Sequence, residues 1–339
     1  MNTLFSNACK RTIQSVPPIW FMRQAGRYHS HYQNLRTQYT FMELCKQPEL
    51  AAQVALGPVQ DFDFDVSILF SDILFPLEAL GMGLDYTDHG PKLGFKLDPT
   101  TIKNLGSVEA AQEFMMFQHH AVKATREALP QNKSLIGFIG GLWTLFVYAV
   151  EGSHAGSLIQ SKVHANLFPL FLDKMYPLLK ENIRLQLNGG AELVMIFDTA
   201  AGEVSPQFYR ELIQPSLSKL CQEYPGKLGY YSKGTQPIFF DREFTQLPWA
   251  GQGFDHRCYL PDCFKIQNKG FVQGNFDQSL LFLDESPFKK AMATYLTPFK
   301  QMTAAERSGW VCGLGHGVLP KTPEKNVRLF IETIRKEFA

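Results

Sequence analysis

The sequence has almost no excess of either charge. Of its 339 residues, 33 are Lys or Arg and 32 are Asp or Glu, so the net charge is +1. Nucleic-acid and membrane-surface binding usually depend on an excess of positive charge, and this balance gives no sign of either partner. Any recognition of an anion must therefore come from local clusters of basic residues.

Long apolar runs and cysteines are also scarce. No stretch reaches the roughly 18 uninterrupted apolar residues that a membrane-spanning helix needs. The first residues, MNTLFSNACKRTIQ, lack the apolar segment of a secretory signal. Six sparse cysteines in such a chain are typical of reduced cytosolic thiols. We therefore expect a cytoplasmic protein.

Several motifs and boundaries are missing. The sequence contains neither the glycine fingerprint of dinucleotide-binding folds nor the lysine motif of phosphate-binding loops. Linkers, low-complexity tracts and repeats are absent as well. These absences favour one domain over residues 1–339.

Short apolar runs rich in β-branched and aromatic residues recur along the chain, with helix-like segments between several of them. The predicted strands are Val66–Phe70, Leu93–Phe95, Leu135–Ile139, Leu193–Phe197, Leu228–Tyr231, Gly251–Phe254, Phe271–Gln273 and Trp310–Leu314. The predicted helices are Pro48–Phe62, Val108–Ala128, Ser161–Asn188, Pro206–Glu223, Pro287–Gln301 and Glu324–Phe338. This alternation indicates an α/β fold with a parallel sheet. Eight strands fit a single-domain (β/α)8 TIM barrel, and a doubly wound open sheet is the alternative.

A barrel also predicts where the chemistry lies, because active sites of this fold form just after the strand ends. Polar residues follow five of the predicted strands: Ser71-Asp72, Asp198-Thr199, Ser232-Lys233, Asn275 and His316. We expect these residues to meet at one mouth of the barrel.

A cluster of arginines precedes the first strong strand, in the segment Trp20–Tyr28. Arg23 and Arg27 are four residues apart, so on a helical turn they would share a face. Guanidinium groups bind carboxylate or phosphate through two parallel hydrogen bonds. With Arg36 further along, the segment predicts a cradle for a polyanion. The alternative is a pair of surface arginines on a turn.

This segment carries a family resemblance. Pro18–Tyr28 closely resembles the N-terminal signature of uroporphyrinogen decarboxylases. Further blocks resemble the family in the family's order: Ile68–Pro76, Ala79–Gly83, Trp143–Leu145 with Tyr148, Ile196–Thr199 with Ala201–Glu203, Gln273–Asn275 and Leu314–Pro320. The resemblance implies a TIM barrel that converts the four acetate arms of uroporphyrinogen to methyls without a cofactor. It also implies a homodimer.

Asp72 is the first candidate for catalysis. Its carboxylate follows the first predicted strand and can accept several hydrogen bonds at once. It would hold pyrrole N–H groups and stabilise the cation that forms when a pyrrole is protonated. The alternative is a helix cap. By resemblance, Asp72 is the family's central aspartate, Arg23, Arg27 and Arg36 hold substrate carboxylates, and Arg23 is a hypothetical proton relay.

Three further residues match the family by position. Tyr148 would contact a substrate arm or Asp72, although tyrosines at such spacing are often core residues. Thr199 would bind a carboxylate or cap the next helix. His316 lies between two glycines and would hold a carboxylate or move a proton near neutral pH. The resemblance implies substrate binding for all three, and catalysis for Tyr148 and His316.

The chain departs from the family pattern at Gly141-Leu142, Ala200, Gly313 and Phe254–Cys258. These changes concern the wall of the pocket rather than the predicted catalytic residues.

Two alternative functions remain. One is a zinc-dependent methyltransferase of the same fold using His256, Cys258 and the distant Cys312, although relatives of that kind carry their ligand pair after the fifth strand, where Ser232–Gly234 stand here. The other is a tetrapyrrole-binding protein without turnover.

Overall fold

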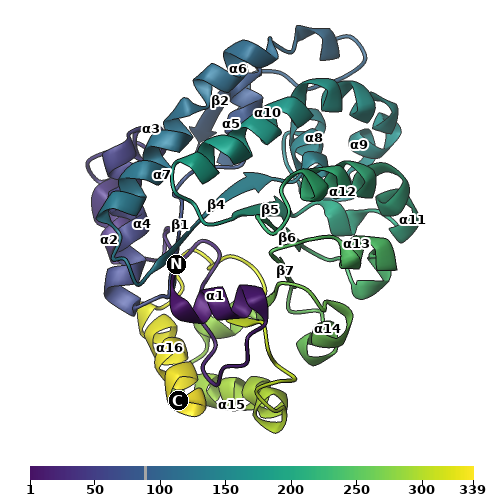
Figure 1. Cartoon of the computed structure of the whole chain (residues 1–339). Helices are drawn as coiled ribbons and strands as arrows, with labels where there is room; N and C mark the ends of the chain where they lie inside the picture. The colour runs from purple at the N-terminus through teal and green to yellow at the C-terminus, as the bar shows by residue number, and fades with distance from the viewer. Residues whose placement is uncertain (88–89) are drawn as a thin grey trace.

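The computed structural model of the protein describes residues 1–87 and 90–339. At its centre is a curled sheet of seven parallel strands with helices around it (Figure 1). The strands are β1 (Val66–Ile68), β4 (Ser134–Gly140), β5 (Val194–Asp198), β6 (Leu228–Ser232), β7 (Gly251–Gly253), β8 (Phe271–Phe276) and β9 (Trp310–Leu314). They are neighbours in chain order, without the reversal of order that marks a doubly wound sheet.

The helices form an outer ring around this sheet (Figure 1). They are α1 (Thr3–Lys10), α2 (Ser30–Arg36), α3 (Phe41–Lys46), α4 (Pro48–Phe62), α5 (Phe75–Ala79), α6 (Val108–Phe114), α7 (Met116–Ala128), α8 (Leu142–Glu151), α9 (Ile159–Val163), α10 (Phe168–Asn188), α11 (Pro206–Phe208), α12 (Gln214–Glu223), α13 (Arg242–Gln246), α14 (Leu260–Ile266), α15 (Glu285–Gln301) and α16 (Glu324–Phe338). A π-helical turn (Tyr209–Ile213) joins α11 to α12, and short 3-10 turns are Ile102–Asn104, Ala165–Leu167, Ala201–Glu203, Pro237–Phe239 and Gln278–Phe282.

Two apolar layers hold the sheet. The larger core lies between the strands and the helices, and a second core fills the inside of the curl. The inner core includes Ile136, Met195, Phe271 and Val311, joined by Phe5 from α1. Alternate residues of a strand face opposite sides of the sheet. Because each side packs against one of the two cores, both faces are apolar, and the strands are continuous hydrophobic runs in the sequence.

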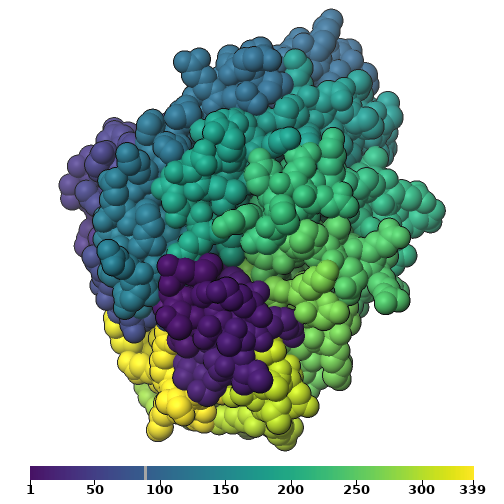
Figure 2. Space-filling model, viewed as in Figure 1, coloured from purple at the N-terminus to yellow at the C-terminus, as the bar shows by residue number. Residues whose placement is uncertain are grey.

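Helix α1 covers one end of the curled sheet. The backbone N–H of Asn2, just before α1, donates to the Ser134 hydroxyl at the start of β4, over 2.8 Å. In Figure 2 the purple N-terminal segment covers the centre of this face. The amino ends of the strands are therefore closed by the chain itself, and only the carboxyl ends remain for a site.

Seven of the eight predicted strands are confirmed, and one is wrong. Leu93–Phe95 is no part of the parallel sheet, because β3 (Gly90–Leu93) pairs antiparallel with β2 (Leu84–Thr87) in a separate hairpin. Along β2, half-buried residues alternate with exposed ones. Such a strand has one solvated face, whereas a strand of a parallel barrel is buried on both.

A segment outside the predicted strands lies beside both β9 and the start of β1. The N–H of Trp20 donates to the Cys312 carbonyl of β9 over 3.1 Å, and the N–H of Asp65 donates to the Ile19 carbonyl over 3.1 Å. The Asp65 carboxylate in turn accepts the Ile19 N–H over 2.7 Å. Residues 18–20 thus lie between β9 and the start of β1.

Three predicted helices are interrupted. Val108–Ala128 divides into α6 and α7, Ser161–Asn188 begins with α9 and a 3-10 turn before α10, and Pro206–Glu223 contains the π-helical turn. The apolar pattern continues through these breaks, which is why the sequence did not reveal them.

Asp65 makes a testable contribution to the fold. Its buried carboxylate binds the Ile19 N–H and, over 2.5 Å, the Arg335 guanidinium of α16. Asp65→Ala leaves both donors without an acceptor, so we expect urea unfolding to show a loss of about 2–4 kcal/mol. The exposed pair of Asp262 and Lys265 is the control, because Asp262→Ala should change stability by no more than about 0.5 kcal/mol. Equal losses in the two variants would contradict this role.

Candidate active site

A cavity of about 970 Å³ opens at the carboxyl ends of β1, β4 and β5. Its size is that of a site for an organic ligand. Six of the seven predicted site residues line it: Arg23, Arg27, Arg36, Asp72, Tyr148 and Thr199. The aromatic rings of Phe138 and Phe197 provide apolar lining at the ends of β4 and β5. Among the described residues, the Asp72 carboxylate, several cations and apolar rings therefore share a single cavity.

Asp72 lies four residues beyond the end of β1, ahead of α5. The Leu74 N–H donates to its Oδ1 over 2.9 Å, and the neighbouring Ser71 hydroxyl is held by the Gln118 amide of α7 at 2.9 Å. Protein surrounds the carboxyl although part of it faces the cavity. This burial raises the pKa of Asp72 above its ordinary value, while hydrogen bonds from Leu74 and Tyr86 and the charge of Arg23 oppose the rise.

The arginine segment is not the helical turn that the spacing suggested. Arg23 has a φ of 58°, in the left-handed region, and its side chain lies against Gly317, where a Cβ atom would be 2.5 Å from Cδ of Arg23. Among residues 1–87 and 90–339, neither Arg23 nor Arg27 has a side-chain hydrogen bond or an ion pair. Arg36 donates to the Tyr39 carbonyl over 2.5 Å. Guanidiniums without a counter-ion beside a cavity are suited to an anionic ligand.

Tyr148 projects from α8 into the cavity and bonds to a residue that the sequence analysis did not select. Its hydroxyl lies 2.5 Å from Nδ1 of His154, in the loop after α8. Burial and the charge of Asp72 raise the pKa of Tyr148 to about 12. Burial, together with Lys233 and Arg23, lowers the pKa of His154. The pair is therefore a neutral hydroxyl and a neutral imidazole at pH 7.

Thr199 is placed by a buried network directly behind it. Asp198, at the end of β5, accepts the Thr144 hydroxyl over 2.6 Å and its N–H over 3.1 Å, and Thr144 Oγ1 accepts the Ala200 N–H. Within the described ranges, the buried Thr199 hydroxyl has no hydrogen-bond partner, and the following 3-10 turn begins at Ala201, after Ala200 at its N-cap, without a side-chain cap. Thr199 therefore does not cap this turn.

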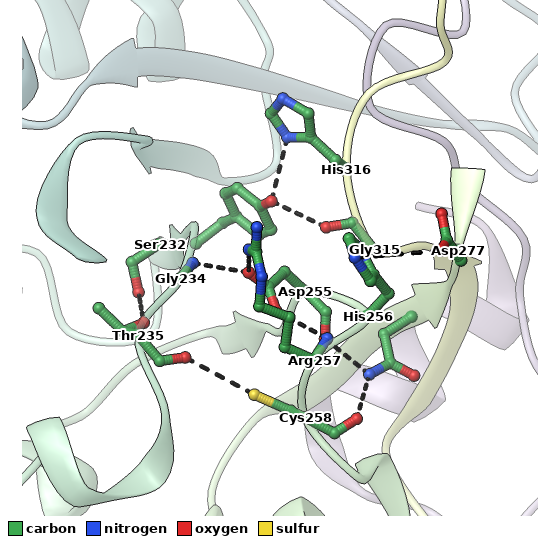
Figure 3. Close-up of polar contacts among 12 residues, drawn as sticks. Ser232, Gly234, Thr235, Asp255, His256, Arg257, Cys258, Asp277, Gly315 and His316 are labelled. Atoms are coloured by element: carbon green, nitrogen blue, oxygen red, sulfur yellow. Dashed lines mark hydrogen bonds and ion pairs between the residues drawn. The ribbon is translucent and has the colours of Figure 1, made fainter. Parts of the chain in front are cut away.

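His316 lies beside the cavity rather than in its lining. Nδ1 of His316, which is labelled in Figure 3, lies 3.1 Å from the Tyr231 hydroxyl. Tyr231 in turn donates to the Gly315 carbonyl over 2.8 Å. Burial and the nearby cations Arg23 and Lys233 lower the pKa of His316 to about 3. In the free protein the imidazole is therefore neutral at pH 7 and can accept a proton, and its predicted catalytic role stays a prediction. A substrate carboxylate bound beside it would raise its pKa.

The residues of the zinc alternative do not converge. Figure 3 shows His256 between Gly315 and Asp277, with its Nε2 4.0 Å from the Asp277 carboxylate. The Cys258 thiol contacts the Thr235 carbonyl at 3.6 Å, and Cys312 is buried within β9. In the part of the chain that the structure describes, no three His, Cys, Asp or Glu side chains are grouped to hold a metal ion.

Comparison with known proteins fits this arrangement. The profile of the family named Uroporphyrinogen decarboxylase (URO-D) matches residues 1–337. The chain belongs to the uroporphyrinogen decarboxylase family. A family relative from Chlorobium phaeobacteroides, named uroporphyrinogen decarboxylase, is 33% identical over 99% of this chain and 98% of its own. Another of that name, from Thermus thermophilus, is 30% identical over 99% and 98%.

A solved structure shares the fold. The "methyltransferase from Methanosarcina mazei" superposes with a TM-score of 0.77 and 17% identity, covering the whole of both chains. This likeness concerns the fold alone. None of the described helices is both long and apolar enough to cross a membrane.

Sequence reasoning missed two residues of this site. Tyr86 lines the cavity from β2, in a segment without a strong strand pattern. His154 lies in a loop of Gly and Ser whose composition suggests only a turn. The nearness of Asp72 to Tyr86, and of Tyr148 to His154, depends on tertiary contacts.

Asp198 gives a pH-dependent prediction. Burial raises its pKa from 3.8 to about 6, so the folded protein holds this proton more tightly than the unfolded chain. Its contribution to the free energy of unfolding is fully present below the pKa of Asp198 in the unfolded chain and is lost as the pH rises through 6. The loss is about 3 kcal/mol, at ~1.4 kcal/mol per pKa unit. Asp198→Asn keeps Oδ1 as an acceptor and does not titrate. In urea unfolding, we expect wild type to lose most of this energy relative to the variant between pH 4 and pH 7, whereas parallel profiles would contradict it.

Proposed function

We propose that this protein removes the four acetate carboxyls of uroporphyrinogen III, giving coproporphyrinogen III and four CO2. Family membership over nearly the whole chain supports the reaction. The single observation that carries it is the charge pattern of the cavity: among the residues that the structure describes, the Asp72 carboxylate lines it together with the guanidiniums of Arg23 and Arg27, which have no protein partner there. A porphyrinogen has the complementary pattern, with pyrrole N–H donors at its centre and carboxylates at its rim.

The proposed chemistry needs only protons. Protonation of a pyrrole turns the ring into an electron-poor cation conjugated to the departing carboxylate. Loss of CO2 returns the bonding electrons to the ring, and a second proton at the exocyclic carbon gives the methyl group. The ring then releases the first proton and regains its aromaticity, so each CO2 lost consumes one net proton. Asp72 would accept the pyrrole N–H groups and stabilise the cation as it forms.

The remaining residues would hold the arms of the macrocycle. Arg23, Arg27 and Arg36 would bind carboxylates through charge-assisted hydrogen bonds, and Arg23 would take part in proton relay. Hydroxyl donors come from Tyr148 and Thr199, and an imidazole from His316, which we propose as substrate contacts, with Tyr148 and His316 also acting in catalysis. No cofactor is needed for these roles.

We also propose that the curled sheet is a closed eight-membered TIM barrel within one domain over residues 1–339. Residues 18–20, which bond to Cys312 of β9 and to Asp65 before β1, would take the position of the eighth strand. The family resemblance further supports a homodimer in the cytoplasm.

Asp72→Asn tests the central role. The amide keeps the shape of the side chain but lacks the negative charge, so we expect a fall in kcat of about 10²–10³. The assay incubates chelator-treated protein with uroporphyrinogen III without oxygen, oxidises the products and separates them by carboxyl number. Wild type should convert eight-carboxyl substrate to four-carboxyl product without added cofactor.

Other results of this assay separate the alternatives. Wild type that leaves the octacarboxylate unchanged contradicts the decarboxylase. Stoichiometric zinc in the purified protein would then favour the methyltransferase, and tight tetrapyrrole binding without CO2 release would favour the inactive protein.

Arg27→Ala tests the carboxylate cradle. Loss of one charge-assisted contact of about 1.5–3 kcal/mol should raise KM by roughly ten- to a hundredfold, with a smaller change in kcat. Arg184→Ala is the matched control, because Arg184 pairs with Glu181 on the surface of α10. A normal KM in Arg27→Ala would remove Arg27 from the cradle.

A further inference from the structure

A chain of buried side-chain amides leads from the backbone of β4 to the wall of the cavity. The register of β1 with β4 ends at the pair Ile68 and Ile136, two residues before Phe138. Beyond that point Gln186 of α10 bonds to the strand: its Oε1 accepts the Phe138 N–H over 2.8 Å, and its Nε2 donates to the Phe138 carbonyl over 2.9 Å. A Cβ atom at Gly137 would lie 2.0 Å from this Oε1, so the glycine lets the amide reach the strand.

The backbone of Phe138 decides which end of the Gln186 amide is the oxygen. A backbone N–H can only donate and a backbone carbonyl can only accept, so the amide has one possible orientation. Its Nε2 carries two hydrogens, and the second is donated to Oε1 of Gln118 on α7, over 2.9 Å. The contact of this nitrogen with Asn182 is longer, at 3.2 Å. Gln118 must therefore present its oxygen to Gln186 and its nitrogen to the other side.

The chain of amides ends at Ser71, three residues beyond β1. Nε2 of Gln118 donates to the Ser71 Oγ over 2.9 Å. Turning the Gln118 amide around would set its N–H group against the N–H of Gln186, and both side chains are buried. Two donors facing each other in the protein interior would leave both without an acceptor. Ser71 Oγ is therefore the acceptor in this contact, and its own hydrogen is not used there.

The remaining hydrogen of Ser71 belongs to a residue of the cavity wall. Ser71 is half-buried and lines the cavity next to Asp72 and in company with Arg23 and Arg27. Within residues 1–87 and 90–339, no protein group accepts a hydrogen bond from its hydroxyl. A hydroxyl whose oxygen already accepts one bond, and whose hydrogen has no protein acceptor, is suited to donate to a ligand.

We propose that Ser71 is a substrate-binding residue whose hydroxyl donates to an anionic oxygen of the ligand, and that Gln186 and Gln118 are positioning residues that keep this hydroxyl a donor. The identity of the ligand rests on the proposed function, whereas the direction of the hydrogen bonds belongs to the free protein. In uroporphyrinogen the pyrrole nitrogens carry hydrogen and are donors, so its acceptors are the carboxylates. Ser71 would therefore hold a carboxylate arm, while the neighbouring Asp72 accepts pyrrole N–H groups.

Ser71→Ala separates this role from a purely structural one. If Ser71 served only as the acceptor for Gln118, its loss would lower stability and leave KM unchanged. Because a donor to a charged oxygen is lost, we expect KM for uroporphyrinogen III to rise by about tenfold, with a smaller change in kcat. Ser71→Thr retains the hydroxyl and should keep KM within about threefold of wild type.

The matched control is Ser161→Ala, which removes another hydroxyl with a protein partner. Ser161 is buried, its hydroxyl donates to Glu151 over 3.2 Å, and it is not part of the cavity lining. This variant should lose stability without a change in KM. An unchanged KM in folded Ser71→Ala, as in the control, overturns the inference.

Neutron diffraction tests the direction of the hydrogen bonds without any turnover. In crystals of the free protein exchanged into D2O, we expect a deuterium of the Gln118 amide between Nε2 and the Ser71 Oγ. A Ser71 deuterium directed at Gln118 instead overturns the inference. Weaker binding of uroporphyrinogen III by Ser71→Ala, in a protein that binds this compound but does not decarboxylate it, supports the inference and refutes the proposed function.

Discussion

The site depends on the burial of one negative charge. Asp72 loses much of its hydration where it stands, which raises its pKa, and the Leu74 N–H, the Tyr86 hydroxyl and the charge of Arg23 offset part of that loss. A carboxylate held in this way is ready to accept donors and to stabilise a cation without reorganisation. Arg23 and Arg27, which have no side-chain partner within the described residues, complete the pattern, because they leave positive charge for a ligand to neutralise.

Rigid elements hold these groups in place. Asp198 and Thr144 fix the turn after β5, which carries Thr199 in the wall of the cavity. Gln118 fixes the Ser71 hydroxyl next to Asp72. At the opposite end of the sheet, α1 covers the amino ends of the strands. Buried hydrogen bonds thus hold the turns of the site in place, and the guanidiniums of Arg23 and Arg27 in the cavity lining remain for a ligand.

Burial and neighbouring charges also set the protonation states of residues beside the cavity. The low pKa of His316 and the raised pKa of Tyr148 keep both neutral at pH 7 in the free protein. Each shift is caused first by burial, and the surrounding cations or the Asp72 charge then add to it. The residue type suggested that His316 titrates near neutral pH, whereas its burial and the nearby cations lower its pKa.

The sequence determined the family, the α/β class and seven of the strands, because periodic apolar runs and ordered motif blocks are local features. It also selected the residues that follow strand ends, of which Asp72 and Thr199 line the cavity. Only the tertiary structure decided that Leu93 belongs to a hairpin, that residues 18–20 lie between β9 and β1, and that Tyr86 lines the cavity. These facts depend on backbone pairing and on burial against other segments, which periodic apolar patterns do not encode.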